Sequence, residues 1–333
     1  MNEPKKRLTT SAMIASLVEE GHPVRPAPFG HALVGLAEKR PEIVGITADL
    51  SKYTDLHVFA QRYPERFYQM GMAEQLLFGA AAGLAREGFL PFVTTYAVFA
   101  SRRAYDFICL AITEERLNVK ICCALPGLTS GYGPSHQATE DIAIFRGMPN
   151  LVIIDPCDAE EIAQAVKVIA DYEGPVYLRL LRGQVPLVLD RYDYRFEIGK
   201  AKLLQDGKDV LVISSGILTM RALKAAEALR KEGIGVAVLH VPTIKPLDER
   251  TIVAEASHPG RAVIVAENHT EIGGLGEAVA ALLVRNRLSP LFHHIALPDR
   301  FLEAGALPTL HDRYGISEKA VIEKIRSIIN KKN

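Results

Sequence analysis

The stretch FLPFVTTYAVFASRRAYDFICLAITEERLNVKICCALPG, residues 89–127, predicts the fold of the first half of the chain. Its two ends, 89–97 and 118–127, are short and apolar, as expected of strands that are buried on both faces. The segment between them, 99–115, has the length and mixed polarity of a helix. A strand, a helix and a second strand in this order predict a right-handed crossover within a parallel sheet.

The same alternation continues in both directions from this stretch. In the first half, further strands are predicted at 42–50, 150–156 and 174–183, and further helices at 29–39, 72–87, 136–147 and 159–172. In the second half, strands are predicted at 209–216, 233–241, 261–269 and 291–296, and helices at 217–232, 248–257, from 276 and at 317–330. The predicted fold class is therefore α/β, with two doubly wound, mainly parallel domains. Their predicted extents are 1–190 and 209–333, the second domain being the smaller, with a linker and domain entry at 191–208.

Composition excludes several classes of function. The 333 residues carry 39 basic and 39 acidic side chains, so no net positive charge is available for a nucleic-acid backbone. No run reaches the roughly 18 apolar residues of a membrane span. The N-terminal sequence has no long apolar core and no small-residue cleavage site, which argues against a secretory signal. We therefore expect a soluble, cytoplasmic protein.

Motifs for metal and phosphate binding are weak. The four cysteines form no CxxC pair, so we expect buried, reduced thiols rather than a zinc site or disulfides. The neighbours His293 and His294 lie in a predicted strand, where they would face opposite sides, and no metal site is predicted. The stretch GGLGEA (273–278) lacks the GxGxxG spacing and is interpreted as helix–strand packing.

Several reactive side chains follow predicted strands, where ligands of parallel sheets bind. Glu74 lies in GMAEQ (71–75), at the start of a small-residue helix. Alone, an acid at this position most often complements the helix dipole. The other candidates are the aromatic pair Tyr96 and Phe99, the adjacent Arg102 and Arg103, His136 at the end of GLTSGYGPSHQ (127–137), and Arg179 and Arg182 in LRLLRGQVP.

With these motifs in place, the sequence resembles the C-terminal half to two-thirds of transketolase and of the related 1-deoxyxylulose-5-phosphate synthase. The matching pieces are ADL (48–50), GMAEQ (71–75), PFVTTYAVFASRRAYD (91–106), GPSHQATEDIAIFRGMPN (133–150), VYLRLLRGQVP (176–186), AENH (266–269) and GGLG (273–276). The resemblance extends from about residue 24 to about residue 325. It implies a pyrimidine-binding domain followed by a transketolase C-terminal domain.

The resemblance also implies a cofactor, thiamine diphosphate. In the family, the acid that matches Glu74 hydrogen-bonds the aminopyrimidine and shares a proton with it. Tyr96 and Phe99 match the aromatic rings that flank the pyrimidine, and Arg102 is assigned with them to cofactor binding. His136 matches a histidine that faces the donor sugar and acts in catalysis. A planar heterocycle between aromatic rings and a proton-sharing acid is a chemically consistent site.

Among the substrate contacts, one residue matches the family and two positions differ from it. Arg182 matches an arginine that binds a substrate phosphate, a role that suits a guanidinium. The serine expected after ADL is replaced by SKYTD, which offers Ser51 or Thr54. Four residues before the histidine, Tyr132 stands where the family has an aspartate that contacts a sugar hydroxyl. This difference predicts a modified ketose or an altered acceptor in place of the usual pentose phosphates.

The chain contains no GDG…N motif, which in the family holds the metal ion and the diphosphate. The resemblance therefore implies the C-terminal subunit of a split transketolase. This subunit would be active only with an N-terminal partner subunit, by which the Mg²⁺ ion is mainly bound. We expect a homodimer of this chain within a heterotetramer, transferring a two-carbon ketol unit from a ketose to an aldose. The alternatives are a beta-type subunit of a 2-oxoacid dehydrogenase, a deoxyxylulose-phosphate-synthase-like half, or a non-catalytic paralogue. The SHQ loop favours the transketolase, because sugar hydroxyls need such a group.

Overall fold

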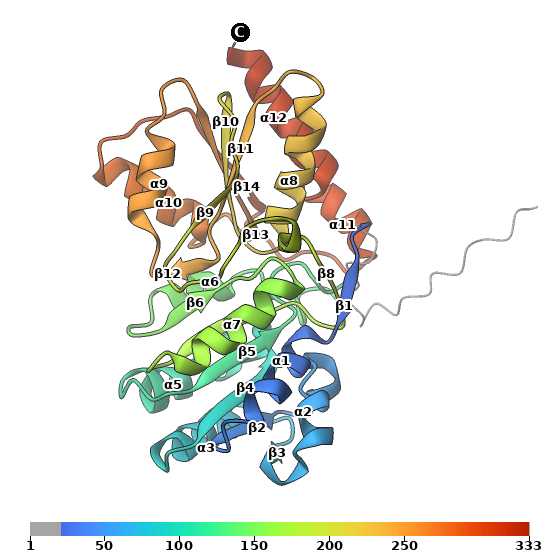
Figure 1. The fold of residues 1–333 in the computed structure, drawn as a ribbon, viewed down its shortest axis with the longest axis vertical. Coiled ribbons are helices and arrows are strands. Elements are labelled where there is room, and N and C mark those ends of the chain that lie inside the picture. Colours follow the sequence, from blue (N-terminus) through green and yellow to red (C-terminus); the bar gives the residue numbers. More distant parts are fainter. Residues whose placement is uncertain (1–20, 333) are drawn as a thin grey trace, which may run out of the picture.

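The computed structural model describes residues 21–332, and Figure 1 shows two α/β units stacked along its long axis. The predicted fold class, two mainly parallel α/β domains, is confirmed. The prediction that no secretory signal is present concerns residues 1–20, which lie outside the described residues. Among the described helices, none combines the length and the apolar character needed to cross a membrane.

The first unit is built on a seven-stranded sheet in the order β12-β6-β7-β5-β4-β2-β3, in which only β12 is antiparallel to its neighbour. Every residue of β2, β4, β5, β6 and β7 is buried, as the continuous apolar runs predict. The strands are β2 (Ile43–Thr47), β3 (Phe67–Gln69), β4 (Leu90–Tyr96), β5 (Lys120–Ala124), β6 (Val152–Ile154), β7 (Val176–Leu180) and β12 (Thr243–Lys245).

Helices cover both faces of this sheet. On one face α1 packs against α7, and on the other α3 packs against α4, α5 and the π turn η4. The helical segments are α1 (Pro28–Ala37), η2 (Ser51–Thr54), α2 (His57–Arg62), η3 (Pro64–Arg66), α3 (Glu74–Arg86), α4 (Ala97–Arg103), α5 (Tyr105–Ile108), η4 (Cys109–Thr113), α6 (Asp141–Arg146) and α7 (Ala159–Asp171).

The second unit has a five-stranded sheet in the order β14-β13-β10-β11-β9, parallel except for β9. Its strands are β9 (Lys202–Gln205), β10 (Val210–Ser214), β11 (Val236–His240), β13 (Ala262–Thr270) and β14 (Phe292–Leu297). Its helices are α8 (Ile217–Arg230), α9 (Glu249–Ala256), α10 (Leu275–Arg285), α11 (Leu307–Arg313) and α12 (Glu318–Lys332). A two-stranded ribbon of β1 (Val24–Pro26) and β8 (Gln184–Pro186) and a short turn, η5 (Leu189–Arg191), complete the elements.

Two predicted helices differ from the structure. The predicted helix 99–115 is divided into α4, α5 and η4, with a break at Ala104, whose φ is −119°. Ser101 and Thr113 each donate a hydroxyl hydrogen bond to the carbonyl four residues earlier, an arrangement that often bends helices. The predicted helix 136–147 begins only at Asp141, because the preceding residues form part of a loop.

Within the segment expected to be a linker, β9 forms an edge strand beside β11. The strand β12, which comes from the second half of the sequence, joins β6 of the first sheet. The two units therefore share backbone hydrogen bonds, such as that from Asp155 N to Pro242 O at 2.8 Å. The four cysteines are free, and three of them are buried.

Candidate active site

A buried carboxylate opens helix α3. The chain leaves β3, turns at Gly71 with a φ of +72°, and begins α3 at Glu74. Only 5% of the Glu74 surface is exposed, and its Oε1 accepts a 3.1 Å hydrogen bond from Nη1 of Arg103. Among residues 21–332, no backbone N–H of α3 bonds this carboxylate, so Glu74 is not a conventional helix cap.

Four of the predicted site residues form one ring cluster beside this acid. Tyr96 ends β4 and Phe99 lies on α4, with ring centroids 5.5 Å apart. His136, on the loop that follows β5, lies 5.9 Å from the Tyr96 ring and 5.5 Å from the Phe99 ring. The centroid of the Tyr132 ring lies 5.3 Å from that of the imidazole. The sheet brings these residues together because β4 and β5 are parallel neighbours whose carboxyl ends meet at one edge.

Arg103 connects the acid to the ring cluster. Its guanidinium lies 3.9 Å from the centroid of the Phe99 ring while bonding Glu74, and its side chain is half exposed. Burial lowers the pKa of His136, and the positive charge of Arg103 lowers it further. His136 is therefore neutral at physiological pH, and Ser135 Oγ lies 2.9 Å from its Nδ1. A neutral imidazole can donate a proton at one nitrogen and accept at the other.

Arg102, predicted to bind the cofactor, points away from the acid. It forms an ion pair with Glu140 and donates a 2.9 Å hydrogen bond to the carbonyl oxygen of Pro134. It therefore holds the loop that carries His136. The arginine that meets Glu74 is its neighbour Arg103, which the sequence analysis named without assigning a role.

A second group of predicted residues lies at the carboxyl ends of β2 and β7. Arg182 follows β7, is 7% exposed, and lies with its guanidinium 5.7 Å from the centroid of the Tyr53 ring. Ser51 begins the turn η2 and is half-buried. Thr54, the alternative to Ser51, is buried and bonds Thr94 Oγ1 at 3.0 Å and a carbonyl of its own turn, so it faces the core.

The ring cluster around Tyr96 and the group around Arg182 interact electrostatically. Burial raises the pKa of Tyr96, the charge of Arg182 opposes this rise, and the neighbouring phenols of Tyr53 and Tyr132 reinforce it. Burial also raises the pKa of Asp55 to about 6, although the Gly183 N–H and the Arg182 charge favour its ionised form. Aromatic, cationic and carboxylate groups therefore border one region at the sheet edge.

The second unit supports the loop that carries His136. The Oδ1 of Asn268, in the AENH motif, accepts a 2.9 Å hydrogen bond from Leu128 N, and its Nδ2 donates to Pro126 O at 3.3 Å. Gly127 has a φ of +58°, and a Cβ there would lie 2.1 Å from Asn268 O, so only glycine fits. Gln137 also donates to Ser130 O at 3.1 Å, which closes the loop on itself.

The other candidate sites have structural explanations. The N-terminal N–H groups of α10, in GGLG, are bonded by the Glu267 carboxylate at 2.7 Å, which agrees with packing rather than phosphate binding. Cys157, Glu161 and His240 have potential ligand atoms within 4.8 Å of one another. However, Glu161 already bonds His240 Nε2 at 2.9 Å, and His240 Nδ1 bonds Thr219 at 2.8 Å, so this group joins α7 to the second unit by hydrogen bonds.

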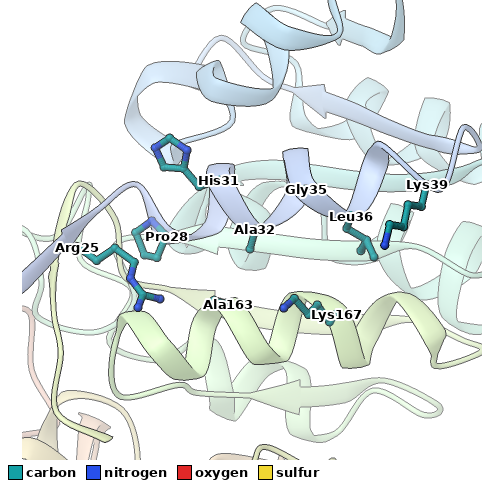
Figure 2. A pocket seen from close by; sticks show the side chains of 9 residues that line it. All are labelled: Arg25, Pro28, His31, Ala32, Gly35, Leu36, Lys39, Ala163 and Lys167. Carbon is teal, nitrogen blue, oxygen red and sulfur yellow. The ribbon is translucent and has the colours of Figure 1, made fainter. Parts of the chain in front are cut away.

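A hollow of about 500 Å³ lies between α1 and α7 (Figure 2). Pro28, Ala32 and Leu36 contribute apolar surface, and Arg25 and Lys167 bring cationic groups to its rim. It contains none of the predicted site residues. The candidate active site is therefore the sheet-edge region around Glu74 and His136.

Comparison with known proteins gives this region a family. Residues 26–188 match the transketolase pyrimidine-binding domain, and residues 199–321 match the transketolase C-terminal domain. A transketolase family protein of Sinorhizobium fredii is 71% identical over 98% of this chain and 94% of its own length. The 6-deoxy-6-sulfo-D-fructose transketolase subunit SqwH of a Clostridium species is 37% identical over 90% of this chain and 93% of its own.

Two further matches are to a longer, single-chain enzyme and to a split-gene transketolase. The 1-deoxy-D-xylulose-5-phosphate synthase of Syntrophotalea carbinolica is 37% identical over 91% of this chain, which spans 48% of that enzyme. A solved split-gene transketolase, described as an inactive beta4 tetramer, aligns with a TM-score of 0.82 and 41% identity over 92% of this chain and 98% of its own. The chain thus belongs to the transketolase family, among the C-terminal subunits of split transketolases.

Proposed function

We propose that this chain is the C-terminal subunit of a two-subunit transketolase, which transfers a two-carbon ketol unit from a ketose to an aldose in the cytoplasm. The observation that carries the proposal is the buried carboxylate of Glu74 beside the ring cluster of Tyr96, Phe99 and His136. The similarity to a sulfosugar transketolase subunit supports a sugar substrate.

The residues of this region fit the pyrimidine end of thiamine diphosphate, the cofactor of this family. Glu74 offers a buried, proton-sharing oxygen, and Tyr96 and Phe99 offer aromatic surface for a flat heterocycle. When bound, thiamine diphosphate would supply the electron sink for breaking and forming the carbon–carbon bond. Mg²⁺ and the diphosphate are assigned mainly to the partner subunit.

The chain's own groups then have separate tasks. Glu74 would share a proton with a ring nitrogen of the pyrimidine, at the carboxylate whose Oε1 accepts from Arg103 in this structure. His136, which is neutral, donates to or accepts from the hydroxyl groups of the sugar. Arg102 holds the His136 loop through Glu140 and Pro134 and acts as a positioning residue. Arg182 and Ser51 face the far end of the substrate.

Exposed apolar side chains support a proposal for how the subunits assemble. Met72, Leu76, Tyr105, Phe107 and Leu110 are exposed on or beside α3, α5 and η4, which pack against one another. Contiguous exposed apolar surface of this kind usually marks a protein interface. We assign this surface to a homodimer contact, with the N-terminal partner subunit completing a heterotetramer.

Reconstitution tests the proposal. The purified chain alone is expected to show no ketol transfer, because in the proposed enzyme the metal ion and the diphosphate are bound mainly by the partner subunit. Mixed with its N-terminal partner, thiamine diphosphate and Mg²⁺, it should transfer a two-carbon unit from ketose donors to aldose acceptors. Chromatography of the sugar products measures this transfer.

The same assay separates the alternatives. Ketol transfer by the chain alone would contradict the two-subunit model. Decarboxylation of a 2-oxoacid with no reaction of ketoses would instead identify a dehydrogenase-type or synthase-type half. A reconstituted complex that binds the cofactor but transforms no substrate would identify a non-catalytic paralogue.

Tyr132 provides a test of substrate choice. The Tyr132 ring packs against His136. A carboxylate at this position could accept a hydrogen bond from a sugar hydroxyl, whereas the phenol is larger and does not carry the carboxylate charge. Tyr132→Asp is therefore expected to shift preference towards unmodified ketose phosphates. The measurement is the ratio of kcat/KM for two donors, since discrimination is defined by that ratio. Tyr68→Asp, which makes the same change at an exposed tyrosine on β3, outside both the ring cluster and the proposed homodimer surface, is the control. An unchanged donor ratio in Tyr132→Asp would show that this position does not face the substrate.

A further inference from the structure

His311, on α11 of the second unit, is a buried histidine with a contact at each ring nitrogen. Its Nε2 lies 2.8 Å from the carbonyl oxygen of Leu128, near the start of the loop that carries Tyr132 and His136. Its Nδ1 lies 2.8 Å from Nη2 of Arg221, on α8. Only 4% of the His311 surface is exposed, so water does not replace either contact. The imidazole ring therefore connects α8 to the His136 loop (127–137).

The two partners of His311 determine its protonation state. A guanidinium donates hydrogen bonds and cannot accept them, so Nδ1 must be the accepting nitrogen. A carbonyl oxygen only accepts, so the proton must lie on Nε2. Burial and the positive charge of Arg221 lower the pKa of His311 to about 3, although the Leu128 carbonyl oxygen favours the charged form. His311 is therefore neutral, with one defined tautomer that donates to Leu128.

Arg221 is held in turn by the chain that follows α11. Its Nη1 donates a 2.7 Å hydrogen bond to the carbonyl oxygen of Ile316. The backbone N–H groups of Ile316 and Ser317 donate to the carbonyl oxygen of His311, at 3.0 and 3.2 Å. These bonds form a closed ring of contacts inside the second unit. The position of the donor that meets the His136 loop is therefore fixed by the second unit.

The second unit bonds both backbone groups of Leu128. Asn268 accepts from the Leu128 N–H, and His311 donates to the Leu128 carbonyl oxygen. Three residues further on, the carbonyl oxygen of Gly131 accepts from Gly305 N at 2.9 Å. The loop has three glycines among its eleven residues, and glycine loses more backbone freedom on ordering than other residues do. Contacts from the second unit therefore help to decide which conformation this loop adopts.

We propose that His311 is a positioning residue: by donating to Leu128, it holds the His136 loop in the conformation that presents His136 to the sugar. The inference rests on the proposed function and gives the second unit a task in a site whose candidate residues all belong to the first unit. Glu74, which begins α3, receives its hydrogen bond from Arg103 of α4. His311 should therefore affect the reaction of the sugar and leave cofactor binding unchanged.

Two amide substitutions separate the two contacts of His311. The side chain of His311→Gln is long enough to place an amide N–H near the position of Nε2 and to donate to Leu128. The side chain of His311→Asn is one methylene shorter, so it keeps an acceptor for Arg221 but does not reach Leu128. Neither substitution introduces a charge. A difference between the two variants therefore reports on the hydrogen bond to Leu128.

The pKa of His136 in the isolated subunit provides a measurement that requires no turnover. Burial and the charge of Arg103 hold this pKa below the ordinary value of 6.5. In His311→Asn the loop should loosen and expose the imidazole to water, so the pKa of His136, followed by NMR, should rise towards 6.5. His311→Gln should keep the wild-type value. The same pKa in the wild-type chain and in both variants would overturn the inference, and so would equal rises in both variants.

A control and a measurement on the wild-type chain complete the binding-independent test. His258→Asn makes the same change at an exposed histidine of the second unit and should leave the pKa of His136 unchanged. In the wild-type chain, ¹⁵N NMR of the imidazole should find His311 neutral at about pH 7, with its proton on Nε2. A charged ring or a proton on Nδ1 would overturn the inference without any substitution.

Turnover of the reconstituted enzyme gives an independent measurement. In His311→Asn, kcat for ketol transfer should fall by about 10–100-fold, because a group misplaced by about 1 Å can cost on the order of 100-fold. The half-saturating concentration of thiamine diphosphate should stay at the wild-type value, whereas a general loss of structure would raise it. If the wild-type complex transfers no ketol unit, the proposed function fails, while the pKa of His136 still decides the role of His311. Wild-type kcat in a folded His311→Asn complex would overturn the inference alone.

Discussion

Glu74→Gln is expected to lower the turnover of the reconstituted enzyme by about 10²–10⁴-fold, as is typical of losing a positioned acid–base group. The substitution keeps the size of the side chain and one hydrogen-bond acceptor for Arg103, so folding and assembly should be preserved. It removes the group that exchanges a proton. Deuterium uptake at the thiazolium carbon of the bound cofactor, followed by NMR, should slow in parallel with turnover.

The control for this prediction lies at the C-terminal end of the same helix. Glu87, just after the end of α3, is exposed, and Glu87→Gln should leave both turnover and deuterium uptake unchanged. If Glu74 only complemented the helix dipole, its replacement would cost at most about 1 kcal/mol of stability and would spare the chemistry. A folded Glu74→Gln complex with normal turnover and exchange would remove the proposed cofactor role.

Arg103 adds a condition that the sequence did not indicate. In the structure its guanidinium occupies both the Glu74 carboxylate and the face of Phe99. The proposed cofactor would contact the same carboxylate and the same ring, so we expect the Arg103 side chain to shift when the pyrimidine binds. The Arg103 side chain is half exposed. Its guanidinium is therefore already in contact with solvent, and the shift does not require a fully buried charge to be exposed. In the proposed complex, the pyrimidine would therefore take the place of the Arg103 guanidinium at one carboxylate oxygen of Glu74.

Much of the architecture could be predicted from the sequence because its central strands are buried on both faces. Continuous apolar runs such as β4 and β5 are stable only in the buried centre of a sheet, in a chain of ordinary polarity. The short edge strands β1, β8, β9 and β12 were missed. Each has only three or four residues, and most of these strands mix polar with apolar positions. Their pairing is decided by distant partners, which no local period can reveal.

The candidate site was predictable for the same topological reason. Residues just after parallel strands converge at one edge, so Tyr96, His136 and Arg182 were accessible to sequence reasoning. Asp55 was not, because its partner Gly183 lies 128 residues away and contributes only a backbone N–H. The sequence analysis assigned Arg102 to the cofactor and gave Arg103 no role, because adjacent helical side chains point about 100° apart and only packing shows that Arg103 meets Glu74.

Arg179, noted in the sequence beside Arg182, has a different task. It is buried on β7, makes two hydrogen bonds, 2.9 and 3.0 Å long, to the Asp141 carboxylate, and forms a second ion pair with Asp155 at 3.1 Å. It also donates to the Asn268 carbonyl of the second unit at 3.0 Å. A single guanidinium thus compensates two buried acids and ties the two sheets together beneath the active site.

Arg179→Met is expected to lower the free energy of unfolding by about 3–5 kcal/mol, because it leaves Asp141 and Asp155 buried without compensation. That loss is a large part of the 5–15 kcal/mol typical of whole domains, and urea unfolding followed by circular dichroism would measure it. Arg285→Met is the matched control, since Arg285 forms an exposed pair with Glu249 and should change stability by at most about 1 kcal/mol. Equal, small losses in both variants would contradict a structural role for Arg179.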